Sequence, residues 1–268
     1  DLKGPLEKAK NLSTNDIYDV VLFWGQSNMV GYCGVYTCSN SIDETDKDAR
    51  VQTYGVDNFS KLSKIDKDII QNYSKMNHVN VDIKPGTVYD YSYLSNSLVE
   101  INKNTQAVGE KIGVSVKNGS PVFSQYQSGA YSIQRSYGTN VIPYFSKVHY
   151  EKTGHKVIVV MAANGGEEIA HFLPHARVLQ LSLSSDSSDK NQYIYEMMTK
   201  KYKAAINYLE SKNLTVGNKF YVAFQGEADV SYAQNGKTSK KRYVDTFKEV
   251  HNTLKKDLDL EFGTIIET

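Results

Sequence analysis

The sequence predicts an α/β fold: a three-layer α/β/α sandwich in which helices cover both faces of a sheet of about five parallel strands. Two observations carry this prediction. The main apolar runs are continuous rather than alternating, which is typical of strands that are buried on both faces. Segments with helical period lie between these runs, and alternation of strand and helix implies right-handed crossovers between parallel strands.

Five apolar runs are interpreted as strands and three periodic segments as helices. In chain order, the strands are expected at 17–24, 51–54, 156–163, 219–225 and 261–267. The helices are expected at 140–153, 193–212 and 239–258. Apolar residues recur three or four positions apart in each of these helices, so each has one face that can pack on the sheet. The clearest stripe consists of Tyr243, Phe247, Val250, Leu254 and Leu258.

The rest of the chain shows no regular period. Residues 1–16 are interpreted as a lead-in or a linker, and residues 17–268 as one domain. The stretch of about 55–140 is polar and rich in Asn, Ser, Tyr and Lys. We expect it to be a loop-rich insertion that mixes short helices with long loops. Loops of this length in a compact domain are often functional, so the insertion is expected to shape the side of the sheet where a ligand binds.

Composition argues against several classes of partner. A formal net charge of +1 over 268 residues does not suit a general polyanion binder, and nothing indicates nucleic acid. No apolar run approaches the roughly 20 residues of a membrane span, so a soluble chain is expected. Cys33 and Cys38 make a poor zinc site by themselves. They are either two free thiols or a local disulfide, which would require an oxidising compartment, and the disulfide is favoured.

The first strand is followed by Gly25-Gln26-Ser27-Asn28-Met29. A buried strand that ends at a Gly-x-Ser turn can hold a hydroxyl at the rim of a sheet, within reach of a substrate. The turn is not the Gly-x-Ser-x-Gly elbow of α/β-hydrolases, because Met29 stands where the second glycine would be. Ser27 is therefore the candidate nucleophile, provided that a base takes its proton.

Two further polar turns follow strands and are expected at the same rim, because ligands bind beyond the carboxyl ends of parallel strands. Residues 164–168 read Asn-Gly-Gly-Glu-Glu, and residues 225–229 read Gln-Gly-Glu-Ala-Asp. Acyl transfer needs donors that stabilise an oxyanion. The candidates are the backbone N–H groups of Ser27 and Gly166 and the side-chain amide of Gln225. Each turn alone would more often be plain structure; the three together indicate an esterase-type site. The supporting residues are Gln26, Asn28, Gly165, Glu227 and Asp229, of which the last two either brace the Gln225 turn or orient a base.

These blocks resemble the SGNH hydrolases, in the version found in sialate O-acetylesterases and family-six carbohydrate esterases. GQSNM at 25–29 is similar to the family's nucleophile block. The Gly165-Gly166 turn followed by Ile169 is similar to the family's Gly-Gly turn, and QGEAD at 225–229 is similar to its QGExD block. The resemblance spans roughly 17–267 and is loose over 55–140. It implies a flavodoxin-like fold and a serine esterase that removes O-acetyl groups from sugars such as sialic acid or xylan. It also implies that no metal or cofactor takes part, and that Gln225 is an oxyanion donor.

The family's general base is a histidine in an Asp-x-x-His segment after the last strand, and this sequence contains no such segment. His171 and His175 follow the Gly-Gly turn and so lie on the right side, but Pro174 between them argues against a two-histidine metal site. Relatives usually carry a bulky aromatic near His171, which suggests a pocket wall, and His171 is the first substitute for the base. Either the catalytic His and Asp lie beyond Thr268 in a longer chain, which is favoured, or this is a silent relative that only binds glycans.

The sequence thus predicts a carbohydrate O-acetyl esterase whose partner is an O-acetylated glycan. A catalytically silent glycan-binding relative and an O-acetyltransferase are the alternatives. Sialate, xylan and peptidoglycan-type substrates all stay open, as does the oligomeric state. An extracellular or cell-surface location in a bacterium fits both a glycan esterase and a Cys33–Cys38 bridge.

Overall fold

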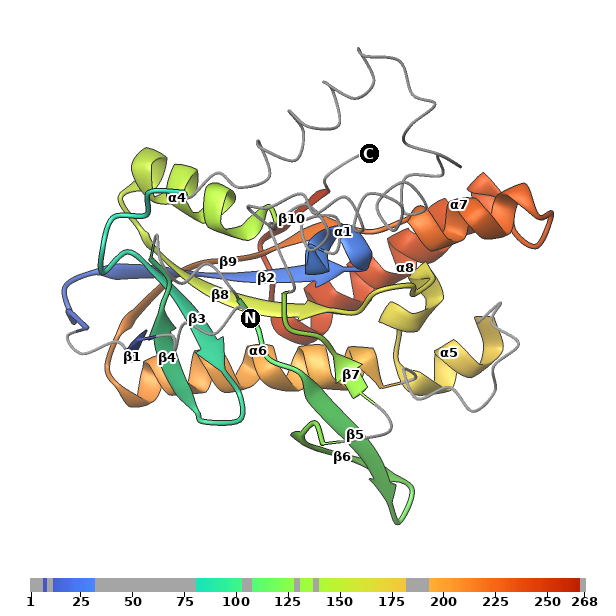
Figure 1. The fold of residues 1–268 in the computed structure, drawn as a ribbon, viewed down its shortest axis with the longest axis horizontal. Coiled ribbons are helices and arrows are strands. Elements are labelled where there is room, and N and C mark those ends of the chain that lie inside the picture. Colours follow the sequence, from blue (N-terminus) through green and yellow to red (C-terminus); the bar gives the residue numbers. More distant parts are fainter. Residues whose placement is uncertain are drawn as a thin grey trace, which may run out of the picture.

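The computed structural model describes residues 7–8, 12–31, 81–102, 108–127, 131–136, 140–181 and 193–265 (Figure 1). In these residues a seven-stranded sheet has the order β1-β4-β3-β8-β2-β9-β10. Its strands are β1 (Glu7–Lys8), β2 (Ile17–Gly25), β3 (Val88–Ser92), β4 (Ser97–Glu100), β8 (Lys156–Ala163), β9 (Thr215–Phe224) and β10 (Phe262–Ile265). The five strands from β3 to β10 in this order run parallel, and β4 and β1 continue the sheet antiparallel. The predicted α/β class is confirmed.

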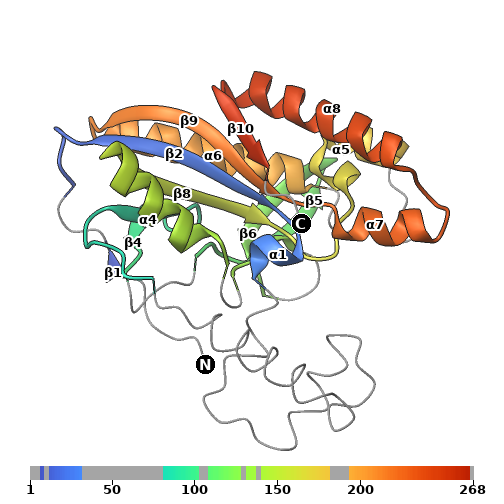
Figure 2. The ribbon, with the colours of Figure 1, turned by 90° about the horizontal axis from the view of Figure 1, so that it is seen from above.

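Helices cover both faces of the sheet, as Figure 2 shows for α4 (Ile142–Thr153) and α8 (Lys240–Leu258). Successive residues of β2 point to opposite faces. Val21 and Phe23 belong to the core under α4, whereas Leu22 and Trp24 belong to the core shared by α8 and α6 (Ile194–Ser211). All four side chains are fully buried, which explains why the run 17–24 is continuously apolar.

Most of the predicted elements in the described residues are found with small shifts of their ends. The predicted strand at 219–225 begins earlier, at Thr215, and the one at 261–267 is β10. The predicted strand at 51–54 lies outside the described residues. The described residues also contain four short helical segments that were not predicted, because none is long enough to show a period: α1 (Ser27–Val30), the 3-10 helix η4 (Ile169–Phe172), α5 (His175–Leu181) and α7 (Glu227–Gln234).

The expectation of short helices and long loops at 55–140 is wrong for the residues of this stretch that the structure describes. These form the β3–β4 hairpin, which extends the central sheet, and a separate sheet with the order β6-β5-β7. The latter consists of β5 (Ile112–Lys117), β6 (Ser120–Gln125) and β7 (Tyr131–Ile133). The sequence does not predict these strands because neither region forms a continuous apolar run. The polar Asp90 interrupts the buried strand β3, and much of the β5–β6 hairpin is exposed.

The order of the parallel strands marks the place where a ligand is expected. Strand β2 lies between β8 and β9, although β8 and β9 are consecutive parallel strands along the chain. The chain therefore leaves β2 towards one side of the sheet and leaves β8, through α6, towards the other. In doubly wound sheets, ligands bind outside the carboxyl ends of the strands at such a switch point. The turns after β2 and β8 flank it.

Candidate active site

The three predicted turns meet at the carboxyl ends of β8, β2 and β9. Gly25 lies in register with Ala163 on one side and with Phe224 on the other, so the three strands end at the same level. Backbone hydrogen bonds continue beyond the strands. The N–H of Gln26 donates to the Phe224 carbonyl at 3.1 Å, and the N–H of Asn164 donates to the Gly25 carbonyl at 2.9 Å. The turns are thus joined directly through their backbones.

Ser27 is the first residue of α1, and its side chain is half-buried. Helix α1 is held against the sheet by Met29 and Val30, which are fully buried in the core beneath α4. None of the described residues forms a hydrogen bond with the Ser27 hydroxyl. The hydroxyl is therefore held at the rim on a packed turn, but no base within the described part of the chain contacts it.

Glu227 joins the turn that carries Ser27 to the turn after β9. Its two carboxylate oxygens accept hydrogen bonds from the side-chain amides of Gln26 and Asn28, which flank Ser27. Hydrogen bonds to an ionised carboxylate are stronger than neutral ones. Glu227 therefore fixes the residues on both sides of Ser27, and its side chain braces the turn that carries Ser27 rather than the side chain of Gln225.

The Gly165–Gly166 turn presents a backbone donor to the surface. Gly166 is exposed with a φ of +81°, a conformation that favours glycine, and none of the described residues accepts a hydrogen bond from its N–H. The N–H of the preceding Gly165 donates to the Gln134 side chain at 3.0 Å. Gln134, which also bridges to Ala163, was missed by the sequence analysis, since nothing in its local sequence marks it.

The Gln225 amide is engaged inside the protein. Its Nε2 donates to the Glu167 carbonyl at 3.1 Å and to Asp229 Oδ2 at 2.9 Å, and Asp229 also accepts from the Ile169 N–H at 2.9 Å. Both Nε2 hydrogens are therefore used, and donation to an oxyanion would require one of these bonds to be exchanged. Asp229 is the brace of this turn. Burial raises the pKa of its carboxyl to about 6, although the hydrogen bonds from Gln225 and Ile169 lower it.

His171 is buried between two carboxylates. Its Nδ1 is hydrogen-bonded to Glu167, and its Nε2 lies 3.6 Å from an oxygen of Glu168. The other Glu167 oxygen accepts from the Asn164 side chain at 3.1 Å. The predicted pocket-wall position is thus part of a buried acidic cluster that orients the imidazole, and no hydrogen bond joins His171 to Ser27.

Three other histidines have structural partners. His149 and His155 both contact the buried Asp19, at the end of β2 opposite to Ser27. His251 accepts or donates a hydrogen bond with the Tyr221 hydroxyl at 2.8 Å.

The remaining predictions fall on other parts of the chain. Cys33 and Cys38 lie outside the described residues. His175 opens α5, and its ring stacks on Tyr193 with 4.2 Å between centroids. Within the described part of the chain, no helix combines the length and the apolar character that crossing a membrane requires.

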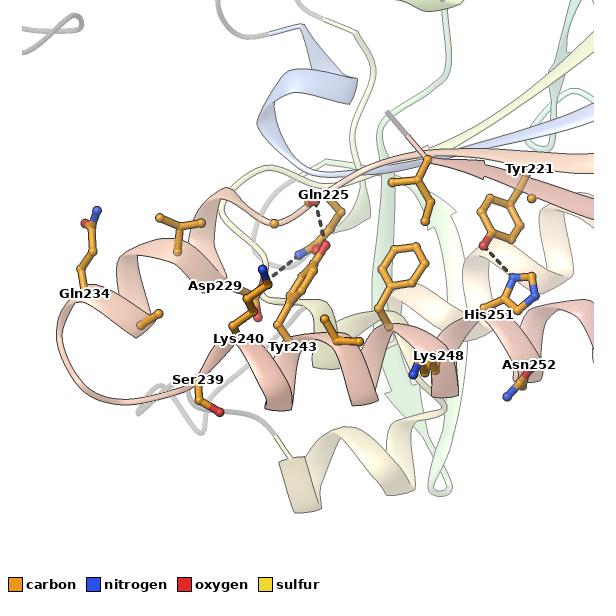
Figure 3. A pocket seen from close by; sticks show the side chains of 17 residues that line it. Tyr221, Gln225, Asp229, Gln234, Ser239, Lys240, Tyr243, Lys248, His251 and Asn252 are labelled. Atoms are coloured by element: carbon orange, nitrogen blue, oxygen red, sulfur yellow. Dashed lines mark hydrogen bonds between the residues drawn. The ribbon is translucent and has the colours of Figure 1, made fainter. Parts of the chain in front are cut away.

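A groove of about 1260 Å³ adjoins the Gln225 turn on the side of α8. It runs between α7, α8 and β10, and most of the surface that lines it is apolar, with Phe247 and Ile265 among the lining residues. Figure 3 shows Tyr243 extending from α8 towards Gln225, whose carbonyl accepts a hydrogen bond from the Tyr243 hydroxyl at 3.0 Å. The candidate site thus has an apolar neighbour that could hold part of a bound molecule.

Comparison with known proteins gives distant structural matches. No protein-family model matches the chain, and no curated protein is significantly similar to it in sequence. A solved protein from Arabidopsis thaliana matches 91% of this chain over 71% of its own length, with 14% identity and a TM-score of 0.43. A carbohydrate acetylesterase from Xanthomonas citri matches 92% of this chain with 13% identity and a TM-score of 0.31, and the chain spans about half of its length (49%). Likenesses this distant say nothing about the reaction of this protein.

Proposed function

We propose that this protein is a serine esterase of the SGNH type that removes O-acetyl groups from carbohydrates through an acyl-enzyme on Ser27. The observation that carries the proposal is the junction of three turns around Ser27, a hydroxyl without a hydrogen-bond partner among the described residues. Glu227 braces both neighbours of Ser27, and Gly166 offers an N–H at the same rim. These are the parts that acyl transfer needs apart from the base.

In the proposed reaction, Ser27 Oγ attacks the acetyl carbonyl as a base takes its proton. The carbonyl oxygen becomes an oxyanion that the N–H groups of Ser27 and Gly166 stabilise. Collapse of the tetrahedral intermediate breaks the bond to the sugar oxygen, which takes the proton from the base and becomes a free hydroxyl, and leaves acetyl-Ser27. Water then attacks this ester, releasing acetate and the free serine. The resemblance assigns the base to the histidine of an Asp-x-x-His segment, and His171 is the proposed substitute for it among the described residues.

One observation favours a second function, a silent relative that binds glycans without cleaving them. The Gln225 amide donates both of its hydrogens to Glu167 and Asp229, whereas the resemblance assigns this amide the role of a hydrogen-bond donor to the oxyanion. A site that has lost catalysis would tolerate this arrangement.

Labelling with a fluorophosphonate, read by intact mass, separates these functions. The chain is labelled with and without added imidazole, which can act as an external base, and is compared with Ser27→Ala and with Ser231→Ala. Ser231 is an exposed serine on α7 and serves as the matched control.

An adduct that is lost in Ser27→Ala and kept in Ser231→Ala supports the esterase. If the adduct forms without imidazole, the chain holds its own base, and loss in His171→Gln would identify it. If the adduct needs imidazole, Ser27 and its donors are in place and the base is supplied from elsewhere. No adduct under either condition overturns the esterase and favours the silent binder. Acetate release from O-acetylated xylo-oligosaccharide and from O-acetylated sialic acid then identifies the sugar.

A further inference from the structure

A second groove lies away from the candidate active site, and its lining residues come from the β3–β4 turn, β6 and the C-terminal half of α6. The ribbons of these elements can be followed in Figure 1. Its volume is about 580 Å³, and none of its lining residues belongs to the three turns around Ser27. Four aromatic side chains line it, together with two side-chain amides: Tyr91, Tyr93, Phe123, Tyr208, Asn96 and Asn207. No charged side chain is among the described residues that line it.

The turn that forms one wall of this groove is pinned from inside the protein. The Glu110 carboxylate accepts hydrogen bonds from the Ser92 hydroxyl at 3.0 Å and from the Leu94 N–H at 3.2 Å. It also accepts from the Tyr93 N–H at 2.5 Å. Glu110 is itself paired at 3.2 Å with Lys201, whose side chain is completely buried. Burying a lysine is costly unless it is paired. Here the buried pair holds a surface turn in one conformation, and a fixed conformation lowers the cost of binding a ligand.

The aromatic and amide groups of the groove are held in a fixed arrangement. The Tyr91 and Tyr208 rings lie 6.0 Å apart, and the Tyr91 hydroxyl donates to Asn96 Oδ1 at 2.8 Å. This bond leaves the Asn96 amide hydrogens to other partners. Asn207 is exposed on α6, and no described residue forms a hydrogen bond with its side chain. The groove therefore combines flat apolar rings with amides that can both donate and accept.

We propose that this groove binds a neutral oligosaccharide. A pyranose ring has an apolar face of C–H groups, which suits Tyr93, Phe123 and Tyr208, and hydroxyls around its edge, which suit Asn96 and Asn207. Sites of this kind are lined by aromatic side chains with a few placed polar groups that fix orientation. The uncharged lining matches an uncharged ligand.

Two lysines lie near the groove, so a comparison of neutral and acidic sugars tests whether the rings and amides or these positive charges govern binding. Lys200 lies over the Phe123 ring at 5.6 Å and Lys212 over the Tyr208 ring at 5.7 Å, both outside the lining residues. If these ammonium groups governed recognition, an acidic sugar would be preferred and binding would weaken steeply with salt. Recognition by rings and amides predicts binding that is insensitive to salt.

The experiment is a titration of the ¹⁵N-labelled chain with xylohexaose, with sialyllactose, and with indole as an aromatic compound that is not a sugar. The variants are Tyr93→Ala and Asn207→Ala in the groove, and Ser27→Ala in the candidate active site. Tyr144→Ala is the matched control, since Tyr144 is a 62% exposed tyrosine on α4, on the other face of the sheet. Thermal unfolding confirms that each variant is folded.

We expect xylohexaose to shift the amide resonances of the β3–β4 turn and of α6, with equal affinity at low and high salt. Tyr93→Ala and Asn207→Ala should each weaken binding at least about fivefold, as expected for the loss of one stacked ring or one amide contact. Tyr144→Ala and Ser27→Ala should bind as the parent does, so this result is independent of whether Ser27 is catalytic. Binding of sialyllactose or indole but not xylohexaose, or equal loss in Tyr93→Ala and Tyr144→Ala, would overturn the proposal.

Discussion

Gly25 allows β2 to end where the candidate nucleophile turn begins. Its φ is +145°, and a Cβ at this position would lie 2.0 Å from the Phe224 carbonyl oxygen of the neighbouring strand. That oxygen belongs to the backbone and accepts the hydrogen bond from Gln26, so it cannot move aside. Any other residue would force β2 and β9 apart at the level of Ser27.

Gly25→Ala is therefore expected to destabilise the protein by more than about 3 kcal/mol, through backbone strain and a steric clash together. The matched control is Gly119→Ala in the β5–β6 turn, where φ is +76° but no atom lies within 4 Å of the added Cβ. The control variant is expected to lose only about 1 kcal/mol of stability, because alanine is strained at this φ but meets no clash. Urea unfolding of the two variants measures the difference, and equal losses would show that the approach to Phe224 does not matter.

At the scale of elements, Asp19 connects β2 to three neighbouring parts of the chain. It lies near the end of β2 that is opposite to Ser27. Its buried carboxylate contacts His149 of α4 at 2.7 Å, His155 before β8 at 3.0 Å, and the Asn218 N–H of β9 at 2.7 Å. Gly217 is required beside it, since a Cβ there would lie 2.3 Å from Asp19 Oδ1. Burial by itself would raise the pKa of Asp19, but the hydrogen bonds from His149, Asn218 and His155 outweigh it, and the pKa is lowered.

Asp19→Asn is expected to cost about 2–4 kcal/mol, because an amide cannot accept all of these bonds and its own hydrogens meet donors. The lowered pKa gives the direction of the pH effect. The stabilisation by Asp19 is present above the unfolded pKa and is lost as the pH falls through the folded pKa. The variant should therefore lose less stability than the parent in acid. Asp245→Asn, at an exposed aspartate of α8, is the control in urea unfolding. A loss no larger than that of the control would contradict the role of Asp19.

At the scale of the whole molecule, two buried carboxyl groups set a pH dependence of the opposite sign. Burial raises the pKa of both Asp90, in β3, and Asp229, in α7, to about 6. Because these values lie above the unfolded one, the folded protein holds the extra protons between about pH 4 and 6. The free energy of unfolding therefore falls as the pH rises through this window.

Asp229→Asn should remove the part of this decrease in the free energy of unfolding that Asp229 causes. That part amounts to about 1 kcal/mol between about pH 5 and 7. An amide oxygen at this position can still accept from Gln225 and Ile169, so the fold is expected to persist. The measurement is urea unfolding at both pH values, with Asp82→Asn at an exposed position as the control. If the parent and Asp229→Asn show the same pH slope, the raised pKa of Asp229 is refuted.

The sequence by itself determined the α/β class, the strands β2, β8, β9 and β10, the long helices, and the three turns at one rim. These features depend on local pattern: buried parallel strands are continuously apolar, and residues that follow parallel strands come together at one edge. Only the tertiary structure decided the β3–β4 hairpin and the pairing of Glu227 with Gln26 and Asn28, which are 201 and 199 positions away in the chain. It alone decided that the Gln225 amide donates its hydrogen bonds inside the protein and that Asp19 is hydrogen-bonded to two histidines. Such contacts depend on strand register and side-chain direction across separate elements, which no local pattern in the sequence contains.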